Sequence, residues 1–326
     1  VQINSAKSCS KQINEGIAQG SLVGPPFFNF MLIDMKNLKT DAKIIKYADD
    51  AVVVFLVDKD DDDGKNSFRL QQLLNELVEY YRDNGFEINC NKSFYMCLGR
   101  PEMVDIKIML NSAGFQYVNE MTYLGIIIDD ELKLGSYVDA LATKMNQGIG
   151  ALFYMKDKLP FSALKQFYFA HIHSHLMYCS FILLRCTEGD LKRLQRLQNR
   201  ALKLIYQLPI LCPTTDLFTL HAPDVLTVKG IMYYSTLLII KRNLISTSPE
   251  RLPIEKQRTN RLNLLKPQMY RRNVMKNDVT CRGINIYNNL PSELKELNQL
   301  NAFKRAVKTY LLKHVEDLLN NTNFMC

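Results

Sequence analysis

Residues 42–57 read AKIIKYADDAVVVFLV, and this stretch decides how the first part of the chain folds. Two β-branched, apolar runs, Ala42 to Tyr47 and Ala51 to Val57, flank the tripeptide Ala48-Asp49-Asp50. Short apolar runs that are bounded by turn residues are typical of paired strands. The sequence therefore predicts a β-hairpin with two carboxylates at its bend.

The neighbouring carboxylates of Asp49 and Asp50 have two interpretations. Like charges so close together are costly unless a cation neutralises them, and hard Mg²⁺ prefers carboxylate and phosphate oxygens. In the alternative interpretation, the two residues only favour a surface turn. The pair alone does not decide between a magnesium site and a turn, because short motifs often match by chance.

The sequence around the hairpin predicts a mixture of helices and short strands. Pro25-Pro26 can begin a helix, and the apolar run Phe27 to Leu38 predicts a buried one. A second helix has one apolar stripe, which Asn84-Gly85 ends, and the stripe consists of Leu70, Leu73, Leu74, Leu77 and Tyr81. Strand-like runs follow at Phe94 to Leu98, Ile106 to Leu110, Phe115 to Val118 and Tyr123 to Ile128, with a hairpin turn at Asn111 to Gly114.

From about Gly135 the pattern changes to long, apolar-periodic helices. The helices that we expect are Leu141 to Leu159, Ala163 to Leu184 and Leu191 to Leu208. The third has an apolar side made of Leu191, Leu194, Leu197, Ala201, Leu204 and Leu208. Its other faces carry Lys192, Arg193, Arg196, Arg200 and Lys203. Residues 225–326 add two helical stretches around the basic segment Arg251 to Arg282, so the fold class is α+β followed by all-α.

Composition excludes several classes of protein. The 326 residues are 47% hydrophobic and 23% charged, which argues against a disordered chain, and the net charge of +8 permits a phosphate-bearing partner without requiring one. No apolar run is long enough to span a membrane, and no secretory leader is present. The eight cysteines are scattered, with no C-x-x-C pair. We therefore expect an intracellular protein, cytoplasmic or nuclear, with reduced thiols.

Four spaced segments stand in order along the first part of the chain. They are Ala18-Gln19-Gly20-Ser21-Leu22-Val23-Gly24-Pro25, then Tyr47-Ala48-Asp49-Asp50, then Gly85-Phe86-Glu87-Ile88-Asn89 with Lys92, and finally Tyr123-Leu124-Gly125. This series resembles the palm of reverse transcriptases, and in detail the non-LTR (LINE-type) retrotransposon branch. The segments Gly283 to Tyr287, Asn288 to Pro291 and Phe303 to Leu312 are similar to the tail that is common in such elements, so the resemblance covers nearly the whole chain.

The resemblance implies an RNA-directed DNA polymerase that uses two Mg²⁺ ions for nucleotidyl transfer. Its partners would be an RNA template, a DNA primer and deoxynucleoside triphosphates, with no membrane. It implies a partial polymerase palm, an antiparallel sheet with packed helices, over residues 1–135. An all-helical thumb would follow over 136–212, with basic helix faces that contact phosphates, and a C-terminal helical and basic region over 213–326.

The resemblance also implies roles for single residues. Asp49 would be the principal metal-binding carboxylate and Asp50 its neighbour, and Lys92 would lie near the leaving pyrophosphate, although it is equally an ordinary exposed lysine. The segments that contact template and incoming nucleotide would be Gln19, Gly20, Ser21, Tyr47 and Ala48. Tyr123, Leu124 and Gly125 would form the primer-gripping strand, or alternatively a core strand that ends in a turn.

Some family features are missing from these residues. The family has another metal-binding Asp on a strand well before the Gln-Gly-Ser segment, yet the first aspartate in this sequence is Asp34. The finger residues that hold the triphosphate are missing as well. We therefore expect an N-terminally truncated fragment that is inactive by itself. The alternatives are a non-catalytic nucleic-acid-binding remnant or decayed transposon copy and, more distantly, an unrelated metal-dependent hydrolase.

Two other groups of residues are weaker candidates. His171 and His175 would align on a helix while His173 points away, which favours a packed or solvent-facing cluster over a zinc site. A basic stretch could bind RNA or form a solvated face, and it comprises Arg258, Arg261, Lys266, Arg271, Arg272 and Lys276.

Overall fold

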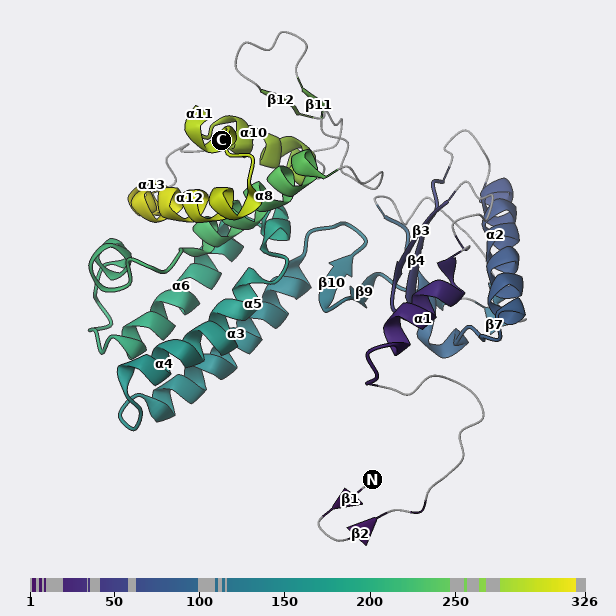
Figure 1. Ribbon diagram of the computed structural model, residues 1–326, viewed down its shortest axis with the longest axis horizontal. Coiled ribbons are helices and arrows are strands. Elements are labelled where there is room, and N and C mark those ends of the chain that lie inside the picture. The colour runs from purple at the N-terminus through teal and green to yellow at the C-terminus, as the bar shows by residue number, and fades with distance from the viewer. Residues whose placement is uncertain are drawn as a thin grey trace. The chain divides into compact units, whose positions relative to one another are not determined.

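The computed structural model describes residues 2–3, 6–7, 9, 20–33, 35, 42–57, 63–98, 109–110, 113–114, 116–246, 255–256, 264–267 and 276–320. The chain divides into two compact units, residues 1–119 and 120–326, which we call the first unit and the helical unit (Figure 1). The described strands pair into six two-stranded sheets, and helices make up most of the second unit. The prediction of an α+β chain is confirmed at this level.

The first unit combines two long elements with several short strands. Its helices are α1 (Gly24–Met31) and α2 (Asp63–Asp83), and its strands are β1 (Gln2–Ile3), β2 (Ala6–Lys7), β3 (Lys43–Tyr47), β4 (Asp50–Val54), β5 (Phe94–Tyr95), β6 (Met109–Leu110), β7 (Ala113–Gly114) and β8 (Gln116–Tyr117). The pairs β1–β2, β3–β4 and β6–β7 are antiparallel, and β5–β8 is parallel. The predicted hairpin on both sides of the two aspartates is confirmed.

Helix α2 also confirms its prediction. Leu73 and Leu77 of the apolar stripe are buried, and the helix ends where Gly85 adopts a φ of 77°, which glycine tolerates best. The backbone N–H of Phe86 donates to the Tyr81 carbonyl at 2.8 Å, and that of Gly85 donates to the Arg82 carbonyl at 3.0 Å. These two bonds form a Schellman motif, which satisfies carbonyls that the helix end would leave free.

The prediction of a buried helix over Phe27 to Leu38 is wrong. Helix α1 ends at Met31, and none of its residues is buried. Phe27 and Phe30 are 57% and 70% exposed, whereas Leu32, just beyond the helix, is buried. An apolar sequence allows a helix to be buried, but burial also needs other elements that cover it. The other described elements of this unit leave every residue of α1 at least partly exposed. Residues 34 and 36–38 lie outside the described part.

The short strands differ in detail from the prediction. Tyr123 to Ile128 is not one strand: it is divided between β9 (Glu120–Tyr123) and β10 (Ile126–Asp129), which form an antiparallel hairpin in the helical unit. The turn residues Leu124 and Gly125 have φ values of 47° and 79°, the signature of a type I′ turn. Near Asn111 to Gly114, β6 and β7 pair as a hairpin, but Ala113 and Gly114 belong to the second strand. Residues 101–108, 111–112 and 115 are outside the described part.

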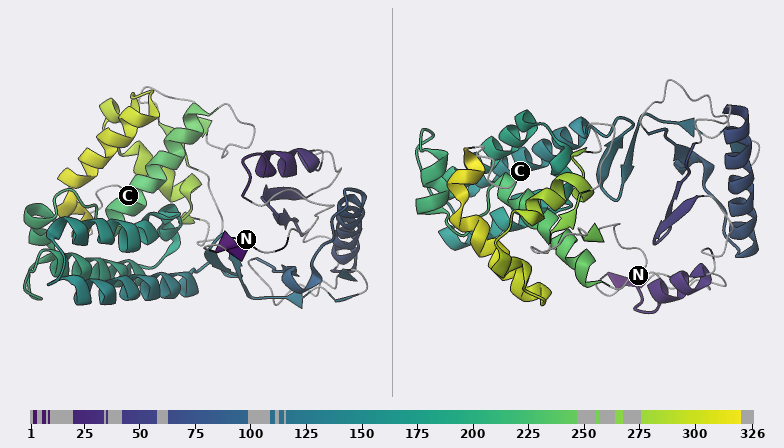
Figure 2. Two further views of the ribbon diagram at one scale, coloured as in Figure 1. Left: turned by 60° about the horizontal axis from the view of Figure 1, so that its bottom comes forward. Right: turned by 90° about the horizontal axis from the view of Figure 1, so that it is seen from above.

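The chain becomes helical from about Gly135, as predicted, but its first long helix begins six residues before the predicted Leu141 and ends four residues before Leu159. Its helices are α3 (Gly135–Met155), α4 (Phe161–Tyr168), α5 (Ser174–Met177), α6 (Glu188–Ile205), α7 (Thr214–Asp216), α8 (Val228–Ile245), α10 (Ile284–Asn288), α11 (Ser292–Lys295), α12 (Leu300–Lys313) and α13 (Val315–Leu319), and its other strands are β11 (Glu255–Lys256) and β12 (Leu265–Lys266). Helix α3 packs against both α4 and α6, and Figures 1 and 2 show the three side by side.

The predicted continuous helix over Ala163 to Leu184 is wrong. Helix α4 passes at Tyr168 into a π-helical turn, Phe169–His173, and α5 ends before Cys179, whose φ is 48°. A 3₁₀ segment, Ser180–Arg185, follows. The π turn brings Ile172 so close to α3 that a Cβ atom added at Gly148 would lie 2.7 Å from its Cγ1. Tight packing against α3 therefore accompanies the change from regular helix.

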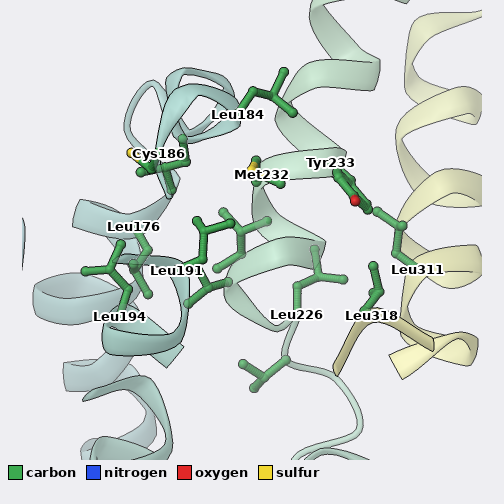
Figure 3. Packing of buried hydrophobic residues seen from close by; sticks show 14 of the residues in the cluster. Leu176, Leu184, Cys186, Leu191, Leu194, Leu226, Met232, Tyr233, Leu311 and Leu318 are labelled. Atoms are coloured by element: carbon green, nitrogen blue, oxygen red, sulfur yellow. The ribbon is translucent and has the colours of Figure 1, made fainter. Parts of the chain in front are cut away.

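One continuous hydrophobic core holds the helical unit together. Helix α8 lies in its middle, where Met232 and Tyr233 have α6 residues such as Leu191 on one side and Leu311 of α12 with Leu318 of α13 on the other (Figure 3). The segments before and after residue 212 thus share a core. Among the described helices, none combines the length and the apolar character needed to cross a membrane.

Candidate nucleic-acid and metal site

The two aspartates lie at the tip of the β3–β4 hairpin. Tyr47 pairs with Asp50 as the last pair of the ladder, so Ala48 and Asp49 form a two-residue turn. Ala48 has a φ of 50°, a left-handed conformation that costs an L-residue roughly 1–2 kcal/mol. Asp49 and Asp50 are both exposed. A strained turn thus presents two adjacent carboxylates to solvent, and strain of this kind is concentrated at functional sites in proteins.

Helix α1 is preceded by a local cap and is joined to the β3–β4 hairpin by the residue that follows it. Gly20 has a φ of 80°, and the Ser21 hydroxyl oxygen accepts a hydrogen bond from the backbone N–H of Gly24 at 3.0 Å. At the other end of α1, the Lys46 ammonium of β3 donates to the Leu32 carbonyl. Gln19 lies outside the described residues.

Lys92 lies at the end of a short 3₁₀ turn, Cys90–Lys92, and its side chain is exposed. The Asn89 side chain caps this turn, because its Oδ1 accepts from the Asn91 backbone N–H at 3.1 Å. The turn follows the glycine stop of α2. The structure therefore unites Tyr47, Ala48, Asp49 and Asp50 in one hairpin and places Lys92 on a separate element of the same unit.

The donor set of the hairpin fits a hard divalent cation. Across the described residues, no cluster of three or more His, Cys, Asp and Glu side chains could hold a metal ion. Asp49 and Asp50 supply two carboxylates, and Mg²⁺ is usually held by one or two carboxylates together with substrate phosphates and water. The residues present therefore fit a magnesium ion that shares its coordination with a nucleotide.

Tyr123, Leu124 and Gly125 form the end of β9 and the turn of the β9–β10 hairpin. The sequence prediction missed two residues that fix this hairpin. The Tyr178 hydroxyl donates to the Leu124 carbonyl at 2.5 Å, and the Asp129 carboxylate accepts from the backbone N–H groups of Lys133 and Leu134. A carboxylate shortly before a helix is a signal for the second contact. Tyr178 is 54 residues from Leu124, and no local pattern reveals it.

Helix α6 carries a basic face. The Thr187–Asp190 capping box begins the helix, and Lys192, Arg196 and Arg200 then recur at four-residue spacing with exposed side chains. Residues four apart share a helix face, so these three lie along about 12 Å of one side. The other two cations of the helix have partners: Arg193 pairs with Asp139, and the Lys203 ammonium donates to the Ile210 carbonyl at 2.6 Å.

The histidines follow their own environments. His171 is exposed and its ring lies 4.4 Å from that of Phe167. The buried Nδ1 of His173 has no hydrogen-bond partner within the described structure. Burial lowers the pKa of His173 to about 4, with Lys308 as a smaller cause. In the basic stretch, Lys266 and Lys276 are described, and the four arginines lie outside the described residues.

Comparisons with known proteins identify a family that matches the first unit and the β9–β10 hairpin that follows it. The family model for "Reverse transcriptase (RNA-dependent DNA polymerase)" matches residues 2–128. The chain carries a reverse transcriptase domain. The reverse transcriptase domain includes the β3–β4 hairpin with its two aspartates, together with Gly20, Ser21, Lys92 and Tyr123 to Gly125.

The relatives come from mobile elements. The chain is 24% identical over 63% of its length to the probable RNA-directed DNA polymerase from transposon X-element of Drosophila melanogaster, and 22% identical over 77% to that from transposon BS of the same species. It is 23% identical over 67% to the RNA-directed DNA polymerase from mobile element jockey of Drosophila funebris. These matches span 23%, 30% and 24% of the relatives, and no solved structure matches. The prediction of a LINE-type reverse transcriptase is confirmed.

Proposed function

We propose that this chain is the palm and thumb portion of an RNA-directed DNA polymerase that copies an RNA template from a DNA primer. The observation that carries the proposal is the strained turn that presents Asp49 and Asp50 within residues that match the reverse transcriptase family. In this assignment residues 1–135 contribute the palm, residues 136–212 the thumb, and residues 213–326 complete the core of the helical unit.

The residues of the first unit have distinct roles in this proposal. Asp49 and Asp50 hold Mg²⁺, which supplies Lewis-acid activation of the primer hydroxyl and charge stabilisation at the triphosphate when bound. The exposed ammonium of Lys92 neutralises charge that develops on the leaving pyrophosphate. Gln19, Gly20, Ser21, Tyr47 and Ala48 contact the template and incoming nucleotide. Gly20 allows the nucleic acid to approach the backbone closely because it lacks a side chain.

The metal assignment predicts the behaviour of an Asp49→Asn variant. In the presence of an RNA–DNA primer–template and a deoxynucleoside triphosphate, the full chain is expected to bind Mn²⁺, which replaces Mg²⁺ in the assay. Asp49→Asn removes a direct ligand, so Mn²⁺ affinity should fall by more than about tenfold, since even indirect partners of metal ligands contribute that much. Electron paramagnetic resonance of free Mn²⁺ measures this affinity.

The control for this experiment is Asp157→Asn, which removes an exposed carboxylate from the helical unit and should leave Mn²⁺ binding unchanged. Equal Mn²⁺ affinity in the wild type and in Asp49→Asn would contradict the metal site. Nucleic-acid binding without any Mn²⁺ binding at the hairpin would favour the alternative function, a non-catalytic nucleic-acid-binding remnant.

The basic face of α6 predicts how nucleic-acid binding depends on salt. Each phosphate contact releases condensed counterions, so affinity falls as salt rises. Each lost contact should therefore reduce the magnitude of the slope of log affinity against log salt concentration by about one. The triple variant Lys192→Ala, Arg196→Ala and Arg200→Ala should therefore reduce the magnitude of this slope by roughly three, which makes binding less sensitive to salt. Fluorescence anisotropy of a labelled RNA–DNA duplex at several salt concentrations measures it.

A charge-matched control separates the α6 face from net charge. The triple variant Lys158→Ala, Arg305→Ala and Lys313→Ala removes the same charge from exposed side chains away from α6, one after α3 and two on α12. It should change the slope by less than half as much as the α6 variant. An equal slope for both triple variants would refute a specific phosphate-binding face on α6 and would leave only a general effect of net charge.

A further inference from the structure

The lower part of the β9–β10 hairpin is held at two places by the rest of the helical unit. At its base, the Asp129 carboxylate accepts hydrogen bonds from the backbone N–H groups of Lys133 at 2.9 Å and Leu134 at 2.6 Å, just before α3 begins. Between base and tip, Ile126 and Ile127 pack against the core. These contacts do not involve the turn residues, and they fix the lower part of the hairpin next to the start of α3.

At the tip, the side chain of Tyr178 contacts the turn. The Tyr178 hydroxyl donates to the Leu124 carbonyl at 2.5 Å, and the Tyr178 ring lies 3.9 Å from the position that a Cβ atom would occupy at Gly125. Both turn residues have positive φ, so the turn has one narrow backbone conformation. The tyrosine therefore hydrogen-bonds to one residue of the turn, and its ring lies beside the other.

The backbone around Tyr178 explains why its side chain reaches the hairpin. Helix α5 ends at Met177, Tyr178 is extended, and Cys179 is left-handed with a φ of 48°. The Tyr178 carbonyl accepts a hydrogen bond from the hydroxyl of the buried Tyr137 at 3.4 Å. A hydrogen bond from the core thus holds the Tyr178 backbone where the helix ends, while Tyr178 itself remains 49% exposed.

We infer that Tyr178 is a positioning residue for the primer end. This inference rests on the proposed function, together with the primer-gripping role that the resemblance to reverse transcriptases implies for Tyr123, Leu124 and Gly125. Tyr178 holds the turn carbonyl and the turn backbone in one place, so the turn presents a preformed surface to the primer terminus. Without the hydroxyl, the turn must be ordered when the primer binds, and that ordering lowers affinity for a primer end in particular.

The test is Tyr178→Phe in the full chain, since this change removes only the hydroxyl. Loss of one hydrogen bond corresponds to about a fivefold change in an opening equilibrium. Hydrogen–deuterium exchange of residues 120–129 in the free protein should therefore be about fivefold faster. The control is Tyr154→Phe, which removes a hydroxyl from an exposed tyrosine on α3 and should leave this exchange unchanged.

The second measurement is the preference of the protein for a duplex with a primer end. A residue that only stabilises the fold would not change this preference. We define the end preference as the affinity for an RNA–DNA duplex with a recessed primer 3′ end divided by that for a blunt duplex of equal length. Tyr178→Phe should lower the end preference about fivefold and leave the affinity for the blunt duplex unchanged, because phosphate contacts elsewhere dominate it.

The outcomes separate the inference from the proposed function. Faster hydrogen exchange in Tyr178→Phe together with a lower end preference supports the positioning role of Tyr178. Unchanged exchange, or faster exchange with an unchanged end preference, overturns the positioning role and leaves the primer grip in place. A wild type that binds duplex but shows no end preference contradicts the primer grip, and with it this inference.

Discussion

Replacing Gln198 with Leu is expected to lower the free energy of unfolding of the helical unit by about 3 kcal/mol, because buried polar groups lose their partners. Gln198 on α6 is completely buried. Its Nε2 donates to the Tyr168 hydroxyl at 3.0 Å and to the Leu226 carbonyl at 2.8 Å, and its Oε1 accepts from Gln195 at 3.0 Å. Leucine has similar volume, so the expected loss comes from hydrogen bonding.

The network around Gln198 explains why the cost should exceed that of one hydrogen bond. Gln195 also donates to Asn199 and accepts from the backbone N–H of Val228, and Asn199 donates to the Thr214 hydroxyl. The network thus links α4, α6, the first residue of α7 and residues 226–228 at the start of α8, and a half-satisfied buried network is less stable than an apolar one.

Urea unfolding followed by circular dichroism at 222 nm measures the effect of Gln198→Leu. Gln166→Leu is the matched control, because Gln166 is exposed on α4, and this variant should stay within about 0.5 kcal/mol of the wild type. A Gln198→Leu variant as stable as Gln166→Leu would show that the network adds nothing to stability.

Acid is expected to destabilise the helical unit through His173, by roughly 3 kcal/mol between pH 7 and pH 4. Burial lowers the pKa of His173 to about 4 from the ordinary 6.5. Above pH 6.5 the side chain is neutral in both the folded and unfolded states. As the pH falls from 6.5 towards 4, the unfolded state binds a proton and the folded state does not, so stability is lost over this range.

The surroundings of His173 give the physical reason for this expectation. Its Nδ1 is buried without a partner in the described structure, and the rings of Phe169 and Tyr168 have centroids 5.0 and 5.8 Å away. Among the described residues, the charge that acts on this ring is the positive charge of Lys308, which a proton on the ring would oppose. Charging therefore opposes folding.

The free energy of unfolding at pH 7 and pH 4 tests this expectation. His173→Leu should remove roughly 3 kcal/mol of the difference between the two pH values. The control is His171→Leu, at an exposed histidine of the same segment, which should retain the wild-type difference. The same acid sensitivity in His173→Leu as in the wild type would assign the effect to other groups.

Much of the fold and site could be predicted from the sequence because the signals are local. The two apolar runs on either side of Ala48-Asp49-Asp50 indicated the hairpin, since two such runs separated by turn residues have few other arrangements. The periodic leucines of α2 and the glycine that ends it were equally direct, because a 3.6-residue period and a left-handed residue at the helix end are properties of the local backbone.

Other features could not be predicted because they depend on distant parts of the chain. The apolar sequence of α1 predicted burial, but burial needs a covering element. The strand over Tyr123 to Ile128 is a hairpin since Leu124 adopts positive φ, which the residue type disfavours. Gln198 and Asn199 look like surface residues in a helical pattern, yet their partners come from α4 and from residues 214–226.

The sequence by itself determined which family the first unit belongs to, where the two carboxylates lie along the chain, and where the helical part begins. Each of these depends on residue order and on dihedral preferences that act over a few positions. The tertiary structure alone decided the helix break at Tyr178, the buried amide network of α6 and the burial of His173 Nδ1. Each of these arises where segments tens of residues apart pack together, and packing of that kind has no periodic signature in the sequence.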